Sequence, residues 1–205
     1  MYWVLRPLCW IFYKLFYRVK IFGKENLIKE GKCIVISNHL CKMDIFVVAA
    51  LYPNKTMFLA KIEWFKNRFF AWILRVMGAI PIDRDKPSLT SIRETLNVLK
   101  ENKRLGIFPE GTRNKNSNEI MEIKQGTAMF AVKGKALLTP VIIHSKIKMF
   151  KTNYAIVGKP IDLSNYYDQK FTDDVSSECS QIILDKMHEL QNELFEKVDN
   201  LKKKA

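Results

Sequence analysis

The feature that most constrains this 205-residue chain is a regular alternation of short apolar runs and amphipathic segments after Gly23. The short runs have the length and β-branched content of buried strands and lie at residues 33–36, 56–60, 79–82, 105–108, 137–143 and 154–157. Segments with helical spacing or helix-stop signals lie between and after them, at residues 43–51, 69–77, 88–103, 126–133 and from about 172 onward. Strands that alternate with helices build a mostly parallel, helix-covered sheet, so we expect an α/β fold.

The composition supports one domain for residues 23–205. The chain is 48% apolar and 27% charged, which is enough to build one hydrophobic core and excludes a disordered chain. It contains no internal repeat and no linker rich in proline and serine. We therefore expect a single domain rather than two domains joined by a linker.

Residues 1–22 have the pattern of an amphipathic helix at a membrane interface. Charged residues interrupt the segment before it reaches the ~20 apolar residues of a membrane span, and a signal-peptide cleavage site is missing. At helical spacing one stripe is apolar: Val4, Leu8, Ile11, Leu15 and Val19. The opposite arc carries basic and aromatic residues: Arg6, Lys14, Arg18, Lys20, Trp3, Trp10, Tyr13 and Tyr17. A helix packed on the core is the alternative, but a polar arc with aromatics and no acid favours a headgroup interface.

The charge is uneven along the chain. The net charge is +13, and residues 1–150 hold 26 basic and 11 acidic side chains against 8 and 10 in residues 151–205. Such a surface suits a polyanion: nucleic acid, an anionic membrane or a phosphorylated substrate. Because nucleic-acid recognition motifs are absent, we do not expect a nucleic-acid partner, although charge alone leaves that alternative open. We expect a peripheral or monotopic protein on the cytoplasmic face of the cell membrane.

Four cysteines occur without a Cys-x-x-Cys pair. Their irregular spacing is typical of reduced thiols in the cytosol rather than of a disulfide framework. Cys33, His39 and Cys41 lie close in sequence but lack a fourth ligand at a familiar spacing, so we expect no metal site.

His39 and Asp44 follow directly on the predicted strand at residues 33–36. On a strand-to-helix turn the carboxylate of Asp44 can fold back onto one imidazole nitrogen and leave the other free to accept a proton. A hydrogen-bonded structural histidine is the alternative. The chain lacks the Gly-x-Ser-x-Gly nucleophile elbow, so an activated nucleophile would belong to the substrate.

Further polar residues follow other predicted strands. Glu110 and Arg113 lie in the segment 108–113, and Arg84 follows residues 79–82. An arginine offers a planar fork that suits a phosphate group, and a glutamate accepts from a hydroxyl or pairs with a cation. The alternative is an ordinary surface turn with an ion-paired arginine.

Taken in order, these segments resemble the four motif blocks of the glycerolipid acyltransferase family, and most of all the 1-acylglycerol-3-phosphate acyltransferases. The matching residues are Asn38-His39 with Asp44, Asp83-Arg84, Phe108-Pro109-Glu110-Gly111-Thr112-Arg113 and Thr139-Pro140-Val141. The resemblance implies that His39 is a general base oriented by Asp44. It also implies a pocket in which Arg113, Arg84 and Lys61 hold the phosphate of the acceptor, with further walls from Glu110, Gly111, Thr112 and, on the acyl side, Pro140.

The activity implied by the resemblance is acyl transfer to the sn-2 hydroxyl of lysophosphatidate, giving phosphatidate without a cofactor. Acyl-CoA or acyl carrier protein would be the co-substrate. Leu40-Cys41 replaces a polar pair that is frequent after the family's histidine, which leaves another lysolipid or glycerol 3-phosphate open as acceptor. Cys41 also allows an acyl-cysteine intermediate, which we disfavour because the acceptor hydroxyl suffices. A catalytically silent membrane adapter is a further alternative, which the complete set of polar blocks argues against.

Overall fold

A computed structural model of the chain describes residues 11, 15–83 and 86–204. Its strands are β1 (Arg18–Phe22), β2 (Ile34–Ser37), β3 (Thr56–Lys61), β4 (Ala79–Ile82), β5 (Arg104–Ile107), β6 (Leu138–Ile143) and β7 (Thr152–Val157). Its helices are α2 (Asp44–Ala50), α3 (Arg68–Met77), α4 (Leu89–Lys100), α5 (Gly126–Gly134) and α6 (Asp173–Lys203), with 3-10 turns η1 (Lys24–Asn26), η2 (Ile62–Phe65) and η3 (Ser164–Tyr166). The alternation predicted from the sequence is confirmed.

The strands form one seven-stranded sheet in the order β1-β7-β6-β2-β5-β3-β4. The β6–β7 pair is antiparallel, and the other neighbouring pairs are parallel. The predicted α/β fold with a mostly parallel sheet is therefore confirmed. β2 lies in the middle of the sheet, and all four of its residues are buried.

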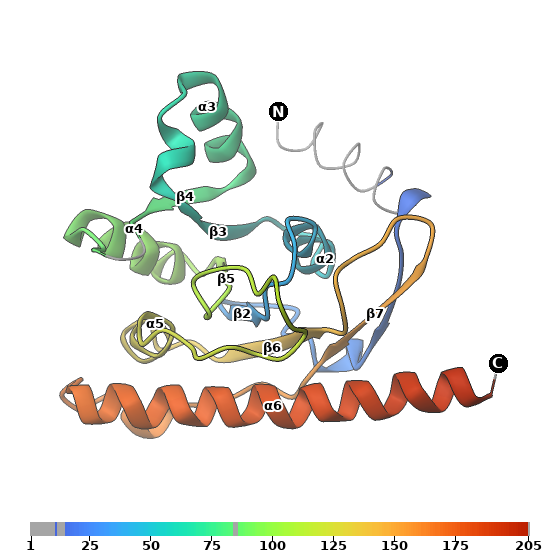
Figure 1. Cartoon of the computed structure of the whole chain (residues 1–205). Coiled ribbons are helices and arrows are strands. Elements are labelled where there is room, and N and C mark those ends of the chain that lie inside the picture. Colours follow the sequence, from blue (N-terminus) through green and yellow to red (C-terminus); the bar gives the residue numbers. More distant parts are fainter. Residues whose placement is uncertain (1–10, 12–14, 84–85, 205) are drawn as a thin grey trace.

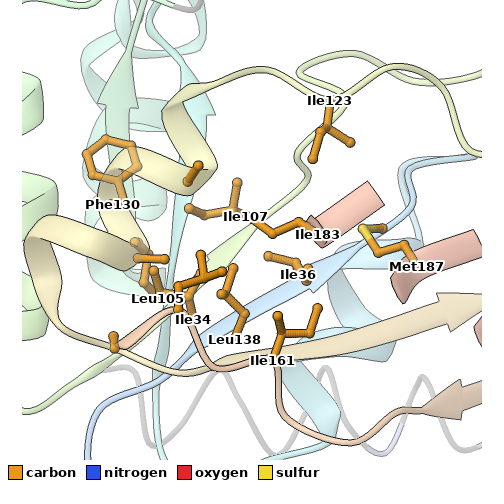
Figure 2. Packing of buried hydrophobic residues seen from close by; sticks show 14 of the residues in the cluster. Ile34, Ile36, Leu105, Ile107, Ile123, Phe130, Leu138, Ile161, Ile183 and Met187 are labelled. Atoms are coloured by element: carbon orange, nitrogen blue, oxygen red, sulfur yellow. The ribbon is translucent and has the colours of Figure 1, made fainter. Parts of the chain in front are cut away.

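Helices cover both faces of this sheet (Figure 1). Ile34 and Ile36 of β2 belong to a large core cluster with residues of α5 and α6, part of which Figure 2 shows from close by. Val35, between them, belongs to a second cluster with Val48 of α2. This alternation follows from the twofold period of a strand, which sends successive side chains to opposite faces. β2 therefore lies between two hydrophobic clusters, and the turn with His39 follows it directly.

The predicted N-terminal helix is wrong at Arg18–Phe22, which form the edge strand β1 parallel to β7. Arg18 and Lys20 are exposed while Val19 and Ile21 are half-buried, which is the period of a strand. The same residues also fit helical spacing, so pairing with β7 decides between the two conformations. Residues 11, 15 and 16 are helical, and residues 1–10 and 12–14 of the predicted helix lie outside the described residues.

Among the residues that the structure describes, no helix combines the length and the apolar character needed to cross a membrane.

Candidate active site

His39 lies just after the carboxyl end of β2, and Asp44 is the first residue of α2. The Nδ1 atom of His39 lies 3.0 Å from Oδ2 of Asp44. Residues five apart do not share one face of a helix, but here a turn precedes the helix and brings the carboxylate back to the ring. The structure thus brings together the pair that the sequence pattern singled out.

The Asp44 carboxylate also holds this turn together. Oδ2 accepts hydrogen bonds from the backbone N–H of Leu40 at 2.6 Å and of Cys41 at 2.7 Å, and the Asp44 residue is fully buried. A carboxylate with several donors in a buried place has a fixed orientation. Asp44 therefore fixes both the shape of the turn and the direction of the imidazole.

The thiol of Cys41 donates to Oδ1 of Asp44 over 3.1 Å. Burial, followed by the charge of the Asp44 carboxylate and its hydrogen bond with the thiol, raises the pKa of Cys41 above its ordinary value. The thiolate, not the thiol, is the reactive nucleophile. The geometry therefore argues against an acyl-cysteine intermediate and favours His39 as the proton acceptor.

Phe108, directly after β5, stacks on the His39 imidazole. Their ring centroids lie 4.0 Å apart with an interplanar angle of 19°. Phe108 also stacks against Phe58 of β3. The side chain of His39 is only 12% exposed, so the aromatic ring covers one face of the imidazole and restrains it. The sequence contained Phe108 within a motif, but its contact with His39 depends on the adjacency of β2 and β5.

Glu110 ties the turn after β5 to the turn after β2. Its Oε1 atom accepts a hydrogen bond from the backbone N–H of His39 at 2.8 Å. A second bond runs from the backbone N–H of Asn114 to the carbonyl oxygen of His39 at 2.7 Å. The turn after β5 thus holds both the backbone N–H and the carbonyl group of His39. The position of the imidazole therefore depends on β5 as well as on β2.

The carboxyl group of Glu110 is buried, and its Oε2 atom lacks a hydrogen-bond partner among the described residues. Burial raises the pKa of Glu110 to about 7, opposed by hydrogen bonds from the backbone of His39 and Met121. Because burial disfavours the charged carboxylate, part of the Glu110 population is protonated near neutral pH.

This burial predicts a pH-dependent stability that Glu110→Gln should abolish. Because the pKa is higher in the folded protein than the ordinary 4.5, the folded state holds the proton more tightly. The free energy of unfolding should therefore fall as the pH rises from about 4.5 to about 7, by of the order of 2 kcal/mol, and then level off. Urea unfolding of both proteins across this range measures the difference. Parallel pH profiles of the two proteins would contradict the prediction.

The remaining residues of this turn surround the site. Gly111 has φ +69°, a conformation that favours glycine, and a Cβ atom there would lie 2.8 Å from Cε of Lys124. Arg113 is half-buried and Thr112 is exposed. Gly111 thus allows the turn to close against Lys124 while Arg113 follows it at the same edge of the sheet.

The other residues expected in the pocket are Lys61, Arg84 and Pro140. Lys61 ends β3, is exposed and forms an ion pair with Glu63 at 2.8 Å. Arg84 lies outside the described residues. Pro140 lies inside β6 in register with Ile36 and, with Gly158, lines a separate cavity of about 820 Å³ beside α6.

Sequence reasoning gave no role to Asn38, which the structure shows to be a structural link. Its side chain donates to the carbonyl oxygen of Ile143 at 2.9 Å and accepts from the N–H of the same residue at 2.8 Å. Asn38 therefore continues the pairing of β2 with β6 beyond the end of β2. Its place next to His39 was the only signal in the sequence.

A largely apolar cavity of about 320 Å³ opens beside Phe108 and Gly111. Apolar side chains from β3, β4, β5 and α5 line it, among them Leu59, Ile82, Ile107 and Met129. Hydrophobic walls with a few polar groups at one end are typical of sites that bind an apolar ligand. The site therefore combines a proton acceptor, a cation and an apolar cavity at one edge of the sheet.

Comparison with known proteins gives a consistent result. The model of the family described as Acyltransferase matches residues 18–144. The 1-acyl-sn-glycerol-3-phosphate acyltransferase of Bacillus subtilis is 28% identical over 86% of this chain and 89% of its own. The protein of the same name from Streptococcus pneumoniae is 33% identical over 67% of this chain, which spans about half (53%) of that relative.

A solved structure resembles the whole fold. The crystal structure of the 1-acyl-sn-glycerophosphate acyltransferase PlsC from Thermotoga maritima superposes with a TM-score of 0.69, covering 93% of this chain and 79% of that one. The two sequences are 23% identical, so this likeness concerns the fold.

Proposed function

The chain belongs to the Acyltransferase family, and from this premise we propose that it acylates the sn-2 hydroxyl of 1-acyl-glycerol 3-phosphate, giving phosphatidate. The observation that carries the proposal is the His39–Asp44 pair, held by Glu110 and Phe108 beside an arginine and an apolar cavity. The acyl donor is a thioester, either acyl-CoA or acyl carrier protein.

The pair supports general-base catalysis. The N–H at Nδ1 of His39 donates to Asp44, which leaves Nε2 as the proton acceptor. Nε2 removes the proton from the sn-2 hydroxyl while that oxygen attacks the thioester carbonyl. The tetrahedral intermediate then expels the thiolate, which takes the proton from the imidazolium and leaves as a thiol. Asp44 keeps the ring in one tautomer and stabilises its protonated form. Each step uses groups of the protein and the two substrates, without a metal or cofactor.

Arg113 supports recognition of the acceptor's phosphate. It follows β5, and Lys61 ends β3, which is parallel to β5, so both lie at the carboxyl edge of the sheet. We propose that Arg113 and Lys61 hold the phosphate, together with Arg84, which lies outside the described residues. Arg113 makes the main contact because it is half-buried next to the His39 turn. Lys61 must first leave Glu63. Glu110, Gly111 and Thr112 shape the same pocket.

The apolar cavity beside Phe108 suits an acyl chain. Its walls come from the core side of the sheet, and its position next to the stacked His39 ring brings an apolar ligand close to the proton acceptor. A chain bound there would place its carboxyl end near His39. The apolar cavity therefore favours a donor that carries an acyl chain over a purely polar donor.

We propose that the amphipathic segment before β1, residues 1–17, holds the protein at the cytoplasmic face of the membrane. Two members of its apolar stripe that the structure describes, Ile11 and Leu15, are exposed rather than packed on the core, Leu15 by 68%. An exposed apolar stripe with cations on the opposite arc is typical of an interfacial helix.

The decisive experiment is an assay of the purified protein with defined substrates. Lysophosphatidate, another lysophospholipid and glycerol 3-phosphate are each offered with acyl-CoA and then with acyl carrier protein. Phosphatidate formation from lysophosphatidate in clear preference to the other acceptors supports the proposal. Preference for another acceptor assigns a different substrate to the same chemistry, and the absence of transfer with every pair rejects the proposed function.

Arg113→Ala should raise the KM for lysophosphatidate about 10- to 100-fold with a smaller change in kcat, because a charge-assisted bond to the phosphate is lost. Arg113→Lys should restore part of the affinity, since it keeps the charge but loses the planar fork. Initial rates at varied acceptor concentration measure both effects. Arg93→Ala, on α4, provides a matched control. An unchanged KM in Arg113→Ala would exclude the phosphate role.

A further inference from the structure

The segment from η2 to the end of α3 exposes an unusual concentration of large apolar side chains. These are Ile62, Trp64, Phe69, Phe70 and Trp72, which we call the α3 face. Phe69 is 65% exposed, Phe70 59% and Trp64 53%. Ala71 is the buried residue of α3, so the helix contributes little to the core. Exposed apolar patches of this kind mark interaction sites.

The exposure does not come from a poorly formed helix. The Asn67 side chain caps the amino end of α3 by accepting from the backbone N–H of Phe69 at 3.0 Å and of Phe70 at 3.2 Å. At the other end Gly78 donates to carbonyl oxygens of the last turn. Both ends continue into paired strands, β3 through η2 and β4 directly. α3 is therefore a firmly attached helix that projects from the body of the molecule (Figure 1).

The three aromatic rings of the α3 face that lie on the helix itself, Phe69, Phe70 and Trp72, lie together. The ring of Phe69 lies 6.1 Å from that of Phe70 and 6.4 Å from that of Trp72, measured between centroids. These contacts join three exposed rings into one aromatic cluster on α3. Tryptophan and phenylalanine in such a place match the headgroup region of a bilayer.

The charges beside the α3 face favour an anionic surface. Residues 61–77 hold four basic residues and one acidic residue, Glu63, which is already paired with Lys61. Lys66, Arg68 and Arg75 are exposed, and the guanidinium of Arg75 lies 5.7 Å from the Phe65 ring centroid. Cations with long apolar stems beside aromatic rings reach lipid phosphates while the rings enter the acyl boundary.

A second exposed apolar group lies on the same side of the molecule. In Figure 1, α3 lies at the top and the loop between β6 and β7 lies at the right, both above α6, which runs along the bottom. Phe150 in that loop is exposed and packs edge-on against Phe16 at 5.6 Å. α6 carries eight acidic and four basic residues, so an anionic membrane would repel the side of the molecule on which α6 lies.

We propose that the α3 face inserts into the headgroup region of an anionic lipid bilayer, as a contact separate from the segment before β1. The proposal extends the membrane association described above, and its test requires no acyl transfer. Together the two contacts would fix the orientation of the protein on the lipid surface.

The tryptophans allow a direct test. The chain has four, and Trp3→Phe with Trp10→Phe leaves Trp64 and Trp72, both on the α3 face. With vesicles of phosphatidylcholine and phosphatidylglycerol in equal parts, the fluorescence should shift to the blue. Brominated acyl chains in the same vesicles should quench it, and vesicles of phosphatidylcholine alone should give weaker binding. Protein that sediments with the anionic vesicles but remains unquenched would overturn the proposal.

A matched pair of variants distinguishes membrane binding through the α3 face from nonspecific hydrophobic binding. Phe69→Ser with Phe70→Ser should lower the vesicle partition coefficient at least about tenfold, because two exposed rings lose their burial in lipid. Leu89→Ser, at the exposed start of α4, should leave the coefficient unchanged. Equal partitioning of both variants would overturn the proposal.

Sedimentation velocity provides the last control. The native chain could form a dimer that dissociates in the double serine variant while vesicle binding persists. That result would assign the α3 face to contact with a second copy of the chain and overturn the proposal. Because these measurements use neither thioester nor lysophosphatidate, an inactive protein can still bind through the α3 face. An active protein can likewise fail the quenching test.

Discussion

His39→Ala is expected to lower acyl transfer about 10³-fold, which is the scale of general-base catalysis. The reason is that Nε2 of His39 is the proton acceptor for the acceptor hydroxyl in the proposed mechanism, and Asp44 is already committed as partner of Nδ1. The fold should persist, because the loss is limited to one ring that stacks on Phe108. The rate of phosphatidate formation, with circular dichroism as a check on folding, measures the effect.

The chain offers its own control for this experiment. His188 lies half-buried on α6, away from the turn after β2. His188→Ala should retain nearly normal transfer under the same conditions. Near-normal transfer by folded His39→Ala would reject the assignment of the base, whatever the outcome for the acceptor.

Asp44→Asn is expected to lower transfer about 10²- to 10⁴-fold, because the amide cannot stabilise a protonated imidazole and can hold the ring in the wrong tautomer. It should also lower the free energy of unfolding by about 1–3 kcal/mol, since the amide group faces the buried N–H groups of Leu40 and Cys41. From sequence alone, one would expect a change at Asp44 to spare the fold. The buried contacts of its carboxylate predict otherwise.

Activity and stability must therefore be measured on the same Asp44→Asn preparation. Rates are taken at a temperature where circular dichroism shows the variant to be folded, and urea unfolding gives the stability. Asp185→Asn, on the exposed face of α6, should change neither quantity. Retained transfer in folded Asp44→Asn would show that the carboxylate supports the turn and not the chemistry.

Most of the sheet could be predicted because its strands are short apolar runs bounded by turn residues. Residues 79–82 were predicted as a strand despite Pro81, and β4 lies at the sheet edge, where a proline is tolerated. β1 could not be predicted in the same way. Its five residues fit both a helical and an alternating pattern, and the hydrogen bonds that select the strand come from β7, more than a hundred residues later.

The sequence alone determined the His39–Asp44 pair, because both residues lie on one local turn between a strand and a helix. It also determined the alternation that makes the sheet mostly parallel. The tertiary structure decided what surrounds the pair: the stacking of Phe108, the bond from His39 to Glu110, and the exposure of the α3 face. The physical reason is that β2 and β5 are neighbours in space but far apart along the chain. A contact between their turns therefore leaves no local pattern in the sequence. An amphipathic helix likewise has the same sequence pattern whether its apolar side faces a core or a membrane.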